Sequence, residues 1–139
     1  MKTNRLYTLL ALLILLISSC SVDTIDVTND DLVTYRTVNI TDYDAVEIAN
    51  AFDAYITFSD TQESIEIEAN DNLHNYIIAK KDNNKLVVRL KNNINVRGQE
   101  TLKVHITTKS IKDFSVAADS KIILENALIE DNAKIKVSA

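Results

Sequence analysis

The sequence contains no proline and only one glycine, Gly98. These two residues usually form the tight turns of a protein, so asparagine and aspartate have to supply most turns of this chain. Clusters rich in such residues recur along the sequence, at 60–63, 70–72, 82–84 and 92–93. We therefore expect short elements that are joined by polar turns.

Cysteine is almost absent as well. Cys20 is the single cysteine, which excludes a disulfide bond within the chain. It follows an apolar run, Leu6–Ile17, that only Thr8 interrupts, and Lys2 and Arg5 precede this run. The run has twelve residues, whereas a helix needs about 20 to cross a bilayer. This length argues against a permanent transmembrane span and leaves the pattern of a secretory signal.

The residues before Cys20, Leu16-Ile17-Ser18-Ser19, resemble a bacterial lipobox. In such lipoproteins the thiol receives a diacylglyceryl group, the signal is removed, and the new amino terminus is acylated, with palmitate among the acyl chains. Each buried methylene adds about 0.8 kcal/mol of membrane affinity, so several chains anchor a protein firmly. The resemblance implies a signal peptide over 1–19, lipidation at Cys20 and a membrane partner for the mature protein. An ordinary signal peptide with an incidental cysteine is the alternative.

Residues 21–34 are polar and acidic and have no helical periodicity, so we expect 20–34 to form a lipidated tether. Basic residues are scarce overall: 15 Lys and Arg stand against 20 Asp and Glu, a net charge of −5. The predicted signal peptide contains two of the basic residues and no acidic one, so the mature chain is more acidic still. An acidic surface without a basic stripe argues against a nucleic-acid partner.

After residue 34 the apolar residues follow a period of two, which predicts β-strands. The clearest strand segments are 46–49, 54–58, 65–69, 85–90 and 102–108. Residues 72–81 have helix-like spacing at Leu73, Tyr76 and Ile77, and they fit one or two helical turns or another strand. The sequence therefore predicts one all-β domain over 35–139.

The C-terminal third contains a short repeat. Residues 114–118 and 135–139 superimpose at an offset of 21, which matches Phe114 with Ile135 and Val116 with Val137. A period near 20 residues is typical of a stacked β-coil, so the repeat predicts a β-solenoid-like coil. A β-sandwich with a coincidental repeat is the alternative. Because the second copy leaves an open strand edge, we expect further C-terminal rungs or a partner to cover it.

Three stretches together resemble a known family: Arg36-Thr-Val with 43–58, then 65–90, and then 101–122. The family is the putative auto-transporter adhesin, head GIN domain, found in lipoproteins of Gram-negative bacteria. The resemblance implies a right-handed β-helix-like coil preceded by irregular β-structure over 35–139, in a chain that is short at its C-terminus. One departure lies at 117–120, where Ala118 stands at the position of a family glycine. Alanine disfavours positive φ, so we expect the local turn to differ.

Catalytic and metal-binding motifs are not apparent. The two histidines, His74 and His105, belong to no HExxH, GxSxG or spaced Cys/His set, and we expect His74 in a loop and His105 on the wet face of a strand. Glu66 and Glu68 share the face opposite Ile65, where two carboxylates can flank a sugar or bind Ca²⁺ but more often only face water. We therefore predict no catalytic residue, no cofactor and no metal site.

Binding is the remaining class of function. The sequence favours a lipid-anchored, non-enzymatic, adhesin-like module of the outer membrane or cell surface, with a glycan or an envelope protein as partner. An envelope enzyme that acts on polysaccharide and a structural or signalling accessory lipoprotein are the alternatives. The candidate contact residues, if exposed, are Tyr35, Tyr43, Tyr55 and Tyr76. We expect the phenylalanines in the core, namely Phe52, Phe58 and Phe114. Four lysines are scattered among strand and turn positions and form no evident cluster, namely Lys103, Lys109, Lys112 and Lys121.

Overall fold

The computed structural model describes residues 23–138, which form an all-β domain with one short 3₁₀ helix, η1. Within this range no helix is long and apolar enough to cross a membrane. The elements are β1 (Ile25–Thr28), β2 (Val33–Thr37), β3 (Ala45–Ile48), β4 (Asp53–Phe58), β5 (Ser64–Asn70), η1 (Asp71–Tyr76), β6 (Ile77–Asp82), β7 (Lys85–Leu90), β8 (Ile94–Arg97), β9 (Leu102–Thr108), β10 (Asp113–Ala117), β11 (Lys121–Leu124) and β12 (Lys134–Ser138). The predicted all-β class is confirmed.

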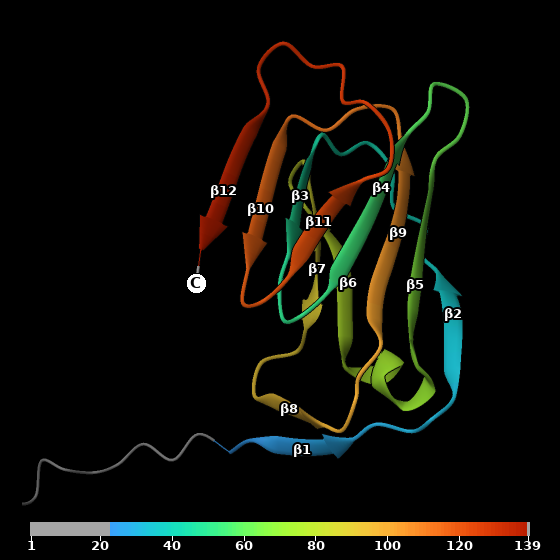
Figure 1. Cartoon of the computed structure of the whole chain (residues 1–139), viewed down its shortest axis with the longest axis vertical. Helices are drawn as coiled ribbons and strands as arrows, with labels where there is room; N and C mark the ends of the chain where they lie inside the picture. The colour runs from blue at the N-terminus through green and yellow to red at the C-terminus, as the bar shows by residue number, and fades with distance from the viewer. Residues whose placement is uncertain (1–22, 139) are drawn as a thin grey trace, which may run out of the picture.

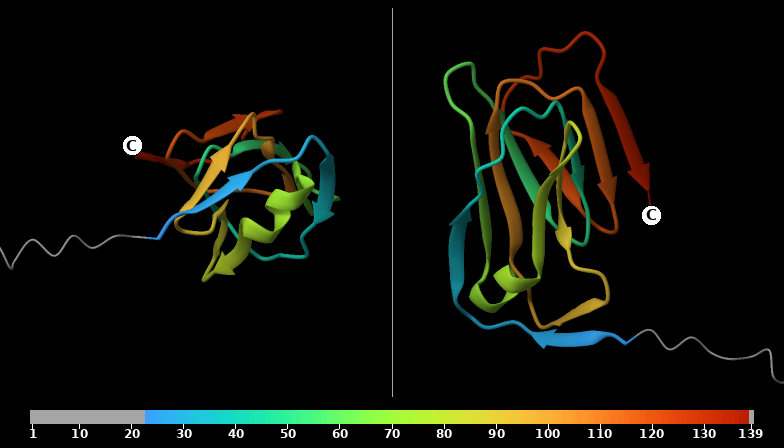
Figure 2. Two further views of the ribbon diagram at one scale, coloured as in Figure 1. Left: turned by 90° about the horizontal axis from the view of Figure 1, so that it is seen from below. Right: turned by 180° about the vertical axis from the view of Figure 1, so that it is seen from behind.

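Two five-stranded sheets face each other (Figure 1). The first, here called the β3 sheet, has the order β12-β10-β3-β7-β6, and the second, the β4 sheet, has the order β11-β4-β9-β5-β2. Both sheets are mixed: β12, β10, β3 and β7 are parallel, as are β11, β4 and β9, whereas β6, β5 and β2 pair antiparallel. A small parallel pair, β1 and β8, crosses one end of the two sheets (Figure 2).

The core lies between the two sheets. Alternate residues of each strand point inward, and side chains from both sheets form one buried cluster that includes Val46, Ile48, Ile56, Ile67 and Ile106. Burial of one such aliphatic side chain contributes about 1.5–3 kcal/mol relative to leaving it exposed. The period-two pattern of the sequence thus fixes which residues point outward, and these form the candidate binding face described below.

Asparagine and aspartate supply most of the left-handed turns, as the composition predicted. The non-glycine residues with positive φ are Asp42, Asn50, Ala51, Asn83, Asn93, Ala118 and Asp119. The expectation of a different turn at 117–120 was wrong at the backbone level, because Ala118 adopts a φ of 51°. A hydrogen bond of 2.9 Å from the Ala51 amide to the Ala118 carbonyl joins this turn to the equivalent turn between β3 and β4. A left-handed alanine costs roughly 1–2 kcal/mol, so this hydrogen bond offsets part of the strain.

The repeat of the C-terminal third corresponds to two neighbouring strands. β10 and β12 pair in parallel, with Phe114 beside Ile135 and Val116 beside Val137. The 21-residue offset therefore gives the observed register. Residues 72–81 combine both alternatives, since η1 covers the first half and β6 the second.

The predicted tether was wrong for its second half. Ile25 pairs with Ile94, and Arg97 donates a hydrogen bond of 2.8 Å to Asp26, so β1 is held by β8. Val27 is buried, and removal of its apolar side chain from water favours the docking of this acidic segment. Any tether therefore ends before Ile25. Cys20 and the predicted signal peptide lie outside the described residues.

Candidate binding face

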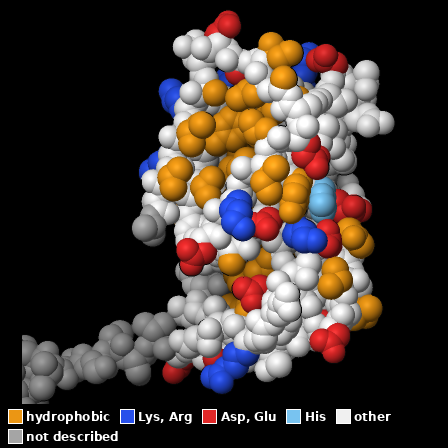
Figure 3. All heavy atoms as spheres, in the orientation of Figure 1, with side chains coloured by type: hydrophobic (Ala, Val, Ile, Leu, Met, Phe, Trp, Pro, Cys, Tyr) orange, Lys and Arg blue, Asp and Glu red, His pale blue; other side chains and the backbone are white. Residues whose placement is uncertain are grey.

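The outer face of the β4 sheet carries a row of charges of alternating sign. The strand register places Glu68 of β5, Lys103 of β9, Asp53 of β4 and Lys121 of β11 beside one another. Lys103 Nζ lies 2.7 Å from Glu68 Oε1, and Lys121 Nζ lies 3.7 Å from Asp53 Oδ1. Figure 3 shows this row as alternating blue and red side chains across the middle of the molecule. Each charge is therefore held in place by its neighbour on the next strand.

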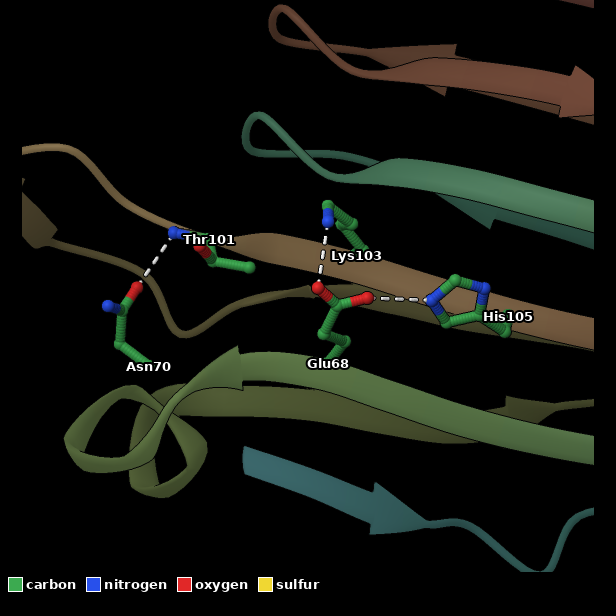
Figure 4. Close-up of polar contacts among 5 residues, drawn as sticks. All are labelled: Glu68, Asn70, Thr101, Lys103 and His105. Atoms are coloured by element: carbon green, nitrogen blue, oxygen red, sulfur yellow. Dashed lines mark hydrogen bonds and ion pairs between the residues drawn. The ribbon is translucent and has the colours of Figure 1, made fainter. Parts of the chain in front are cut away.

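Glu68 is the charged residue of this row that is held by two partners. Its side chain is 13% exposed, and its carboxylate contacts two residues of β9, since His105 Nε2 lies 3.0 Å from its second oxygen (Figure 4). Partial burial by itself raises the pKa of Glu68, but the hydrogen bonds from Lys103 and His105 together outweigh burial and hold the pKa below its usual range. The hydrogen bond to Glu68 in turn raises the pKa of Lys103. Both groups are therefore charged at neutral pH.

Two rings lie flat against each other above this row. Tyr55 of β4 and His105 of β9 are register partners, and their ring centroids are 5.3 Å apart with an interplanar angle of 14°. A third ring, Tyr35, stands beside Glu68 on β2 and is 61% exposed. The sheet thus presents aromatic surface, a carboxylate and an ammonium group side by side. We call these five residues the tyrosine–histidine face: Tyr35, Tyr55, Glu68, Lys103 and His105.

The neighbouring Asn70 shows how β5 is fixed in position. Its side chain is buried, donates a hydrogen bond of 2.5 Å to the Asp30 carbonyl and accepts one of 2.7 Å from the Thr101 amide (Figure 4). A buried amide that satisfies both of its ends ties β5 to the start of β9. Asn70 therefore has a structural role and helps to position Glu68 opposite Lys103.

The predicted contact residues divide into two groups. Tyr35 and Tyr55 reach the surface of the tyrosine–histidine face, whereas Tyr43 is buried. Burial raises the pKa of Tyr43 to about 12. Tyr76 packs against the core, and Lys91 Nζ lies 5.9 Å from the centre of its ring. Only two of the four tyrosines can therefore contact a ligand from the sheet face.

The predicted core phenylalanines are confirmed at Phe52 and Phe114, which are buried, and Phe58 is partly buried against the core. His74 lies in η1 and not in a loop, where its Nε2 is 3.3 Å from the Thr34 carbonyl oxygen. His105 points away from the apolar side of β9, as its alternation with apolar neighbours predicted.

The lysines are less scattered than the sequence suggested. Lys103 and Lys121 stand in one row, although 18 residues separate them in the chain, because their strands flank β4. Lys109 lies apart from this row, beside a hollow between the loops that follow β4, β9 and β11. The alternation of outward residues was visible in the sequence, but the order of the strands was not.

Glu66 and Glu68 do lie on the outward side of β5, as predicted, and Glu68 is occupied by its two β9 partners. Among residues 23–138 no three His, Cys, Asp or Glu side chains come together as a metal site requires. The chemistry that the face offers is therefore ring stacking and charged hydrogen bonding.

Comparison with known proteins supplies the family. The profile described as "Putative auto-transporter adhesin, head GIN domain" matches residues 42–139, which is most of the chain. The chain belongs to this family. Membership supports an adhesin-like role at the cell surface or envelope. No curated protein matches the chain in sequence.

Solved structures support the same fold. A crystal structure of a "putative adhesin" from Parabacteroides merdae is 22% identical with a TM-score of 0.71, and the match covers 81% of this chain and 46% of that one. A "putative adhesin" from Bacteroides fragilis is 21% identical with a TM-score of 0.73, over 79% and 51% of the two chains. A "putative lipid binding protein" from Parabacteroides distasonis is 18% identical with a TM-score of 0.65, over 72% and 44%. The head GIN chain thus spans about half the length of these relatives, and the likeness concerns the fold.

Proposed function

We propose that this head GIN protein is a lipid-anchored, non-enzymatic module of the cell envelope that binds a glycan on the tyrosine–histidine face. The observation that carries the proposal is the stacked pair of Tyr55 and His105 beside the fixed charges of Glu68 and Lys103. A glycan is favoured over a compact small molecule, because a flat sheet face suits an extended polymer.

The chemistry of a sugar matches the parts of this face. A pyranose ring exposes C–H groups on one side, and these groups pack on the electron-rich face of an aromatic ring. Its hydroxyl groups donate hydrogen bonds to a carboxylate such as Glu68 and accept them from an ammonium group such as Lys103. Because these two side chains already hold each other in place, little side-chain entropy is lost when a sugar binds.

A lipid at Cys20 would place the domain at a membrane in a defined way. Four residues lie between Cys20 and Ile25, so an extended chain reaches at most about 18 Å from one to the other. β1 lies at the end of the molecule opposite the loops at 59–63 and 125–133 (Figure 1). We infer that the β1 end faces an outer membrane and that the sheet faces stand free on the cell surface.

The anchor has a simple test. Cys20→Ala should move the protein from the membrane fraction to the soluble fraction and leave its circular dichroism spectrum unchanged. Ser21→Ala serves as the matched control and should stay in the membrane fraction. A Cys20→Ala variant that remains membrane-bound would contradict lipid anchoring without affecting the proposal for the binding face.

We also propose that the parallel strands belong to a right-handed, solenoid-like coil. The proposal is supported by the stacking of β3, β10 and β12 in one sheet and of β4 and β11 in the other. In such a coil the outward residues of successive rungs form ladders across the face. The outward charges Lys103, Asp53 and Lys121 on the parallel strands β9, β4 and β11 form one such ladder.

Retention on an array of bacterial and host glycans tests the binding proposal. We expect the wild type to be retained by at least one glycan, Tyr55→Ala to lose retention, and Glu47→Gln on the opposite sheet to behave as the wild type. Shortened products released from a glycan would favour the envelope enzyme instead. Retention of no glycan, together with co-purification of one envelope protein, would favour the accessory role.

A further inference from the structure

A second row of outward residues on the β4 sheet ends at a carboxylate. The strand register places Ile123 of β11, Tyr55 of β4, His105 of β9 and Glu66 of β5 beside one another. Figure 3 shows this row as apolar side chains, the pale blue histidine and an acidic side chain in succession. Glu66 is exposed, and within residues 23–138 no hydrogen bond or ion pair engages its side chain. The stacked rings therefore have beside them a carboxylate that is available to a ligand.

The remaining charges of the two rows already hold each other. Lys103 Nζ lies 2.7 Å from Glu68 Oε1, as Figure 4 shows, and Lys121 Nζ lies 3.7 Å from Asp53 Oδ1. Each ammonium group thus has a carboxylate of its own. The two rows contain three carboxylates and two ammonium groups, and Glu66 is the carboxylate that remains. The surface around the stacked rings therefore carries an excess of negative charge.

An acidic glycan would fit these two rows poorly. To reach Lys103, its acidic group would have to displace Glu68, whose carboxylate is also held by His105. It would also lie close to the unpaired charge of Glu66, and like charges repel. Such repulsion is a common source of specificity, because it weakens the wrong ligand. The arrangement of charges therefore favours a glycan without acidic groups.

We propose that the glycan carries a free amino group, as a deacetylated amino sugar does, and that Glu66 binds the resulting ammonium group. This inference rests on the proposed function, since it names the class of glycan that the same face takes. Neighbouring strands lie about 5 Å apart, so β5 is about 5 Å from β9 and about 10 Å from β4. A sugar ring that packs on His105 and Tyr55 therefore has Glu66 within reach of its substituents. An ammonium group forms a stronger hydrogen bond to a carboxylate than a neutral hydroxyl group does.

The test compares three tetrasaccharides of different charge. The glucosamine tetramer and the N-acetylglucosamine tetramer share one backbone and differ only in the acetyl group, and the galacturonic acid tetramer is acidic. Amide shifts of ¹⁵N-labelled protein at pH 6 and low salt measure each affinity. We expect the glucosamine tetramer to bind about threefold more tightly than the acetylated one, since an exposed ion pair contributes modestly. Added salt should reduce this preference, and the acidic tetramer should bind most weakly.

Three variants separate the charge of Glu66 from the rings. Glu66→Gln should bind both glucosamine tetramers equally, because the amide keeps the shape of the side chain but loses its charge. Glu100→Gln is the matched control, since it removes the same charge from another exposed glutamate, and it should keep the wild-type preference. Tyr55→Ala should weaken the binding of both tetramers by the same factor, because both pack on the same ring.

Three results would overturn the inference: equal or tighter binding of the acetylated tetramer, a preference that survives in Glu66→Gln, or tightest binding of the acidic tetramer. In each case glycan binding by the tyrosine–histidine face still stands, provided that the shifts lie on this face and that Tyr55→Ala weakens binding. Absence of binding by all three tetramers would also contradict the inference, and the glycan array then decides the proposed function separately.

Discussion

The outer faces of the two sheets carry nearly the same ion pair in different surroundings. On the β4 sheet Lys103 lies 2.7 Å from Glu68, and on the β3 sheet Lys85 lies 2.6 Å from Glu47. Glu68 is 13% exposed and has a histidine as second partner, whereas Glu47 is 35% exposed. The ion pair is therefore common to both faces, and among residues 23–138 the stacked rings of Tyr55 and His105 distinguish the β4 sheet from the β3 sheet.

The largest expected effect comes from the stacked rings. Tyr55→Ala should weaken binding of the best-retained glycan by up to about tenfold, because an aromatic contact contributes about 0.5–1.5 kcal/mol beyond its buried area. Tyr55→Phe keeps the ring and should retain most of the affinity. Glu47→Gln on the β3 sheet should leave the affinity for that glycan unchanged. Isothermal calorimetry with that glycan measures all three, and equal losses for the Ala and Phe variants would argue against stacking.

The two glutamates should also differ in their effect on stability. Glu68→Gln should lower the free energy of unfolding by about 1 kcal/mol, since it weakens two charged hydrogen bonds of a mostly buried side chain. Glu47→Gln should lower it by less than about 0.5 kcal/mol, as is typical of exposed pairs. Urea unfolding at pH 7 compares the variants. Equal decreases in the free energy of unfolding for the two variants would show that the two ion pairs contribute equally to stability.

Low pH should remove the contribution of Glu68 to the free energy of unfolding. Its pKa is held below the usual value, so the stabilisation is present above the unfolded-state pKa of about 4.3 and is lost as the pH falls through the lower native pKa. The difference in unfolding free energy between the wild type and Glu68→Gln should therefore shrink steadily from pH 5 to pH 3. Urea midpoints at each pH provide the measurement. A difference that stays constant would contradict the direction of the pKa shift.

The smallest expected effect on stability concerns the turn between β10 and β11 that contains Ala118. Ala118→Gly should stabilise the protein by about 0.5 kcal/mol, because glycine relieves the left-handed strain but gains freedom in the unfolded chain. Ala117→Gly is the matched control within β10 and should destabilise by about 0.5–1 kcal/mol. Thermal unfolding distinguishes the two variants. A destabilised Ala118→Gly variant would show that the backbone of this turn is not strained.

The sequence predicted much of the fold from alternation alone. The strands around Val46, Ile67 and Val104 and the pairing of Phe114 with Ile135 follow from period two and from the 21-residue repeat. β1 was missed because its alternation covers only four residues in an acidic segment, and its docking depends on β8, which lies about 70 residues further along the chain.

The candidate binding face was only partly visible in the sequence. Outward positions such as Glu68 and His105 could be assigned from their apolar neighbours, but their contact could not, because it depends on β5 lying beside β9. The contact of Tyr55 with His105 could not be assigned either, because it depends on the parallel pairing of β4 with β9, and the two residues are 50 positions apart in the sequence. Cross-strand register, and not local pattern, creates the tyrosine–histidine face.

The most direct test of the central claim is to map the glycan on the protein. Amide shifts of ¹⁵N-labelled protein should be recorded during titration with the glycan that the array retains best. We predict that the changes concentrate at Tyr55, Lys103 and His105 on the β4 sheet and leave Glu47 and Lys85 unaffected. Changes centred on the β3 sheet, or the same affinity in Tyr55→Ala, would contradict the account.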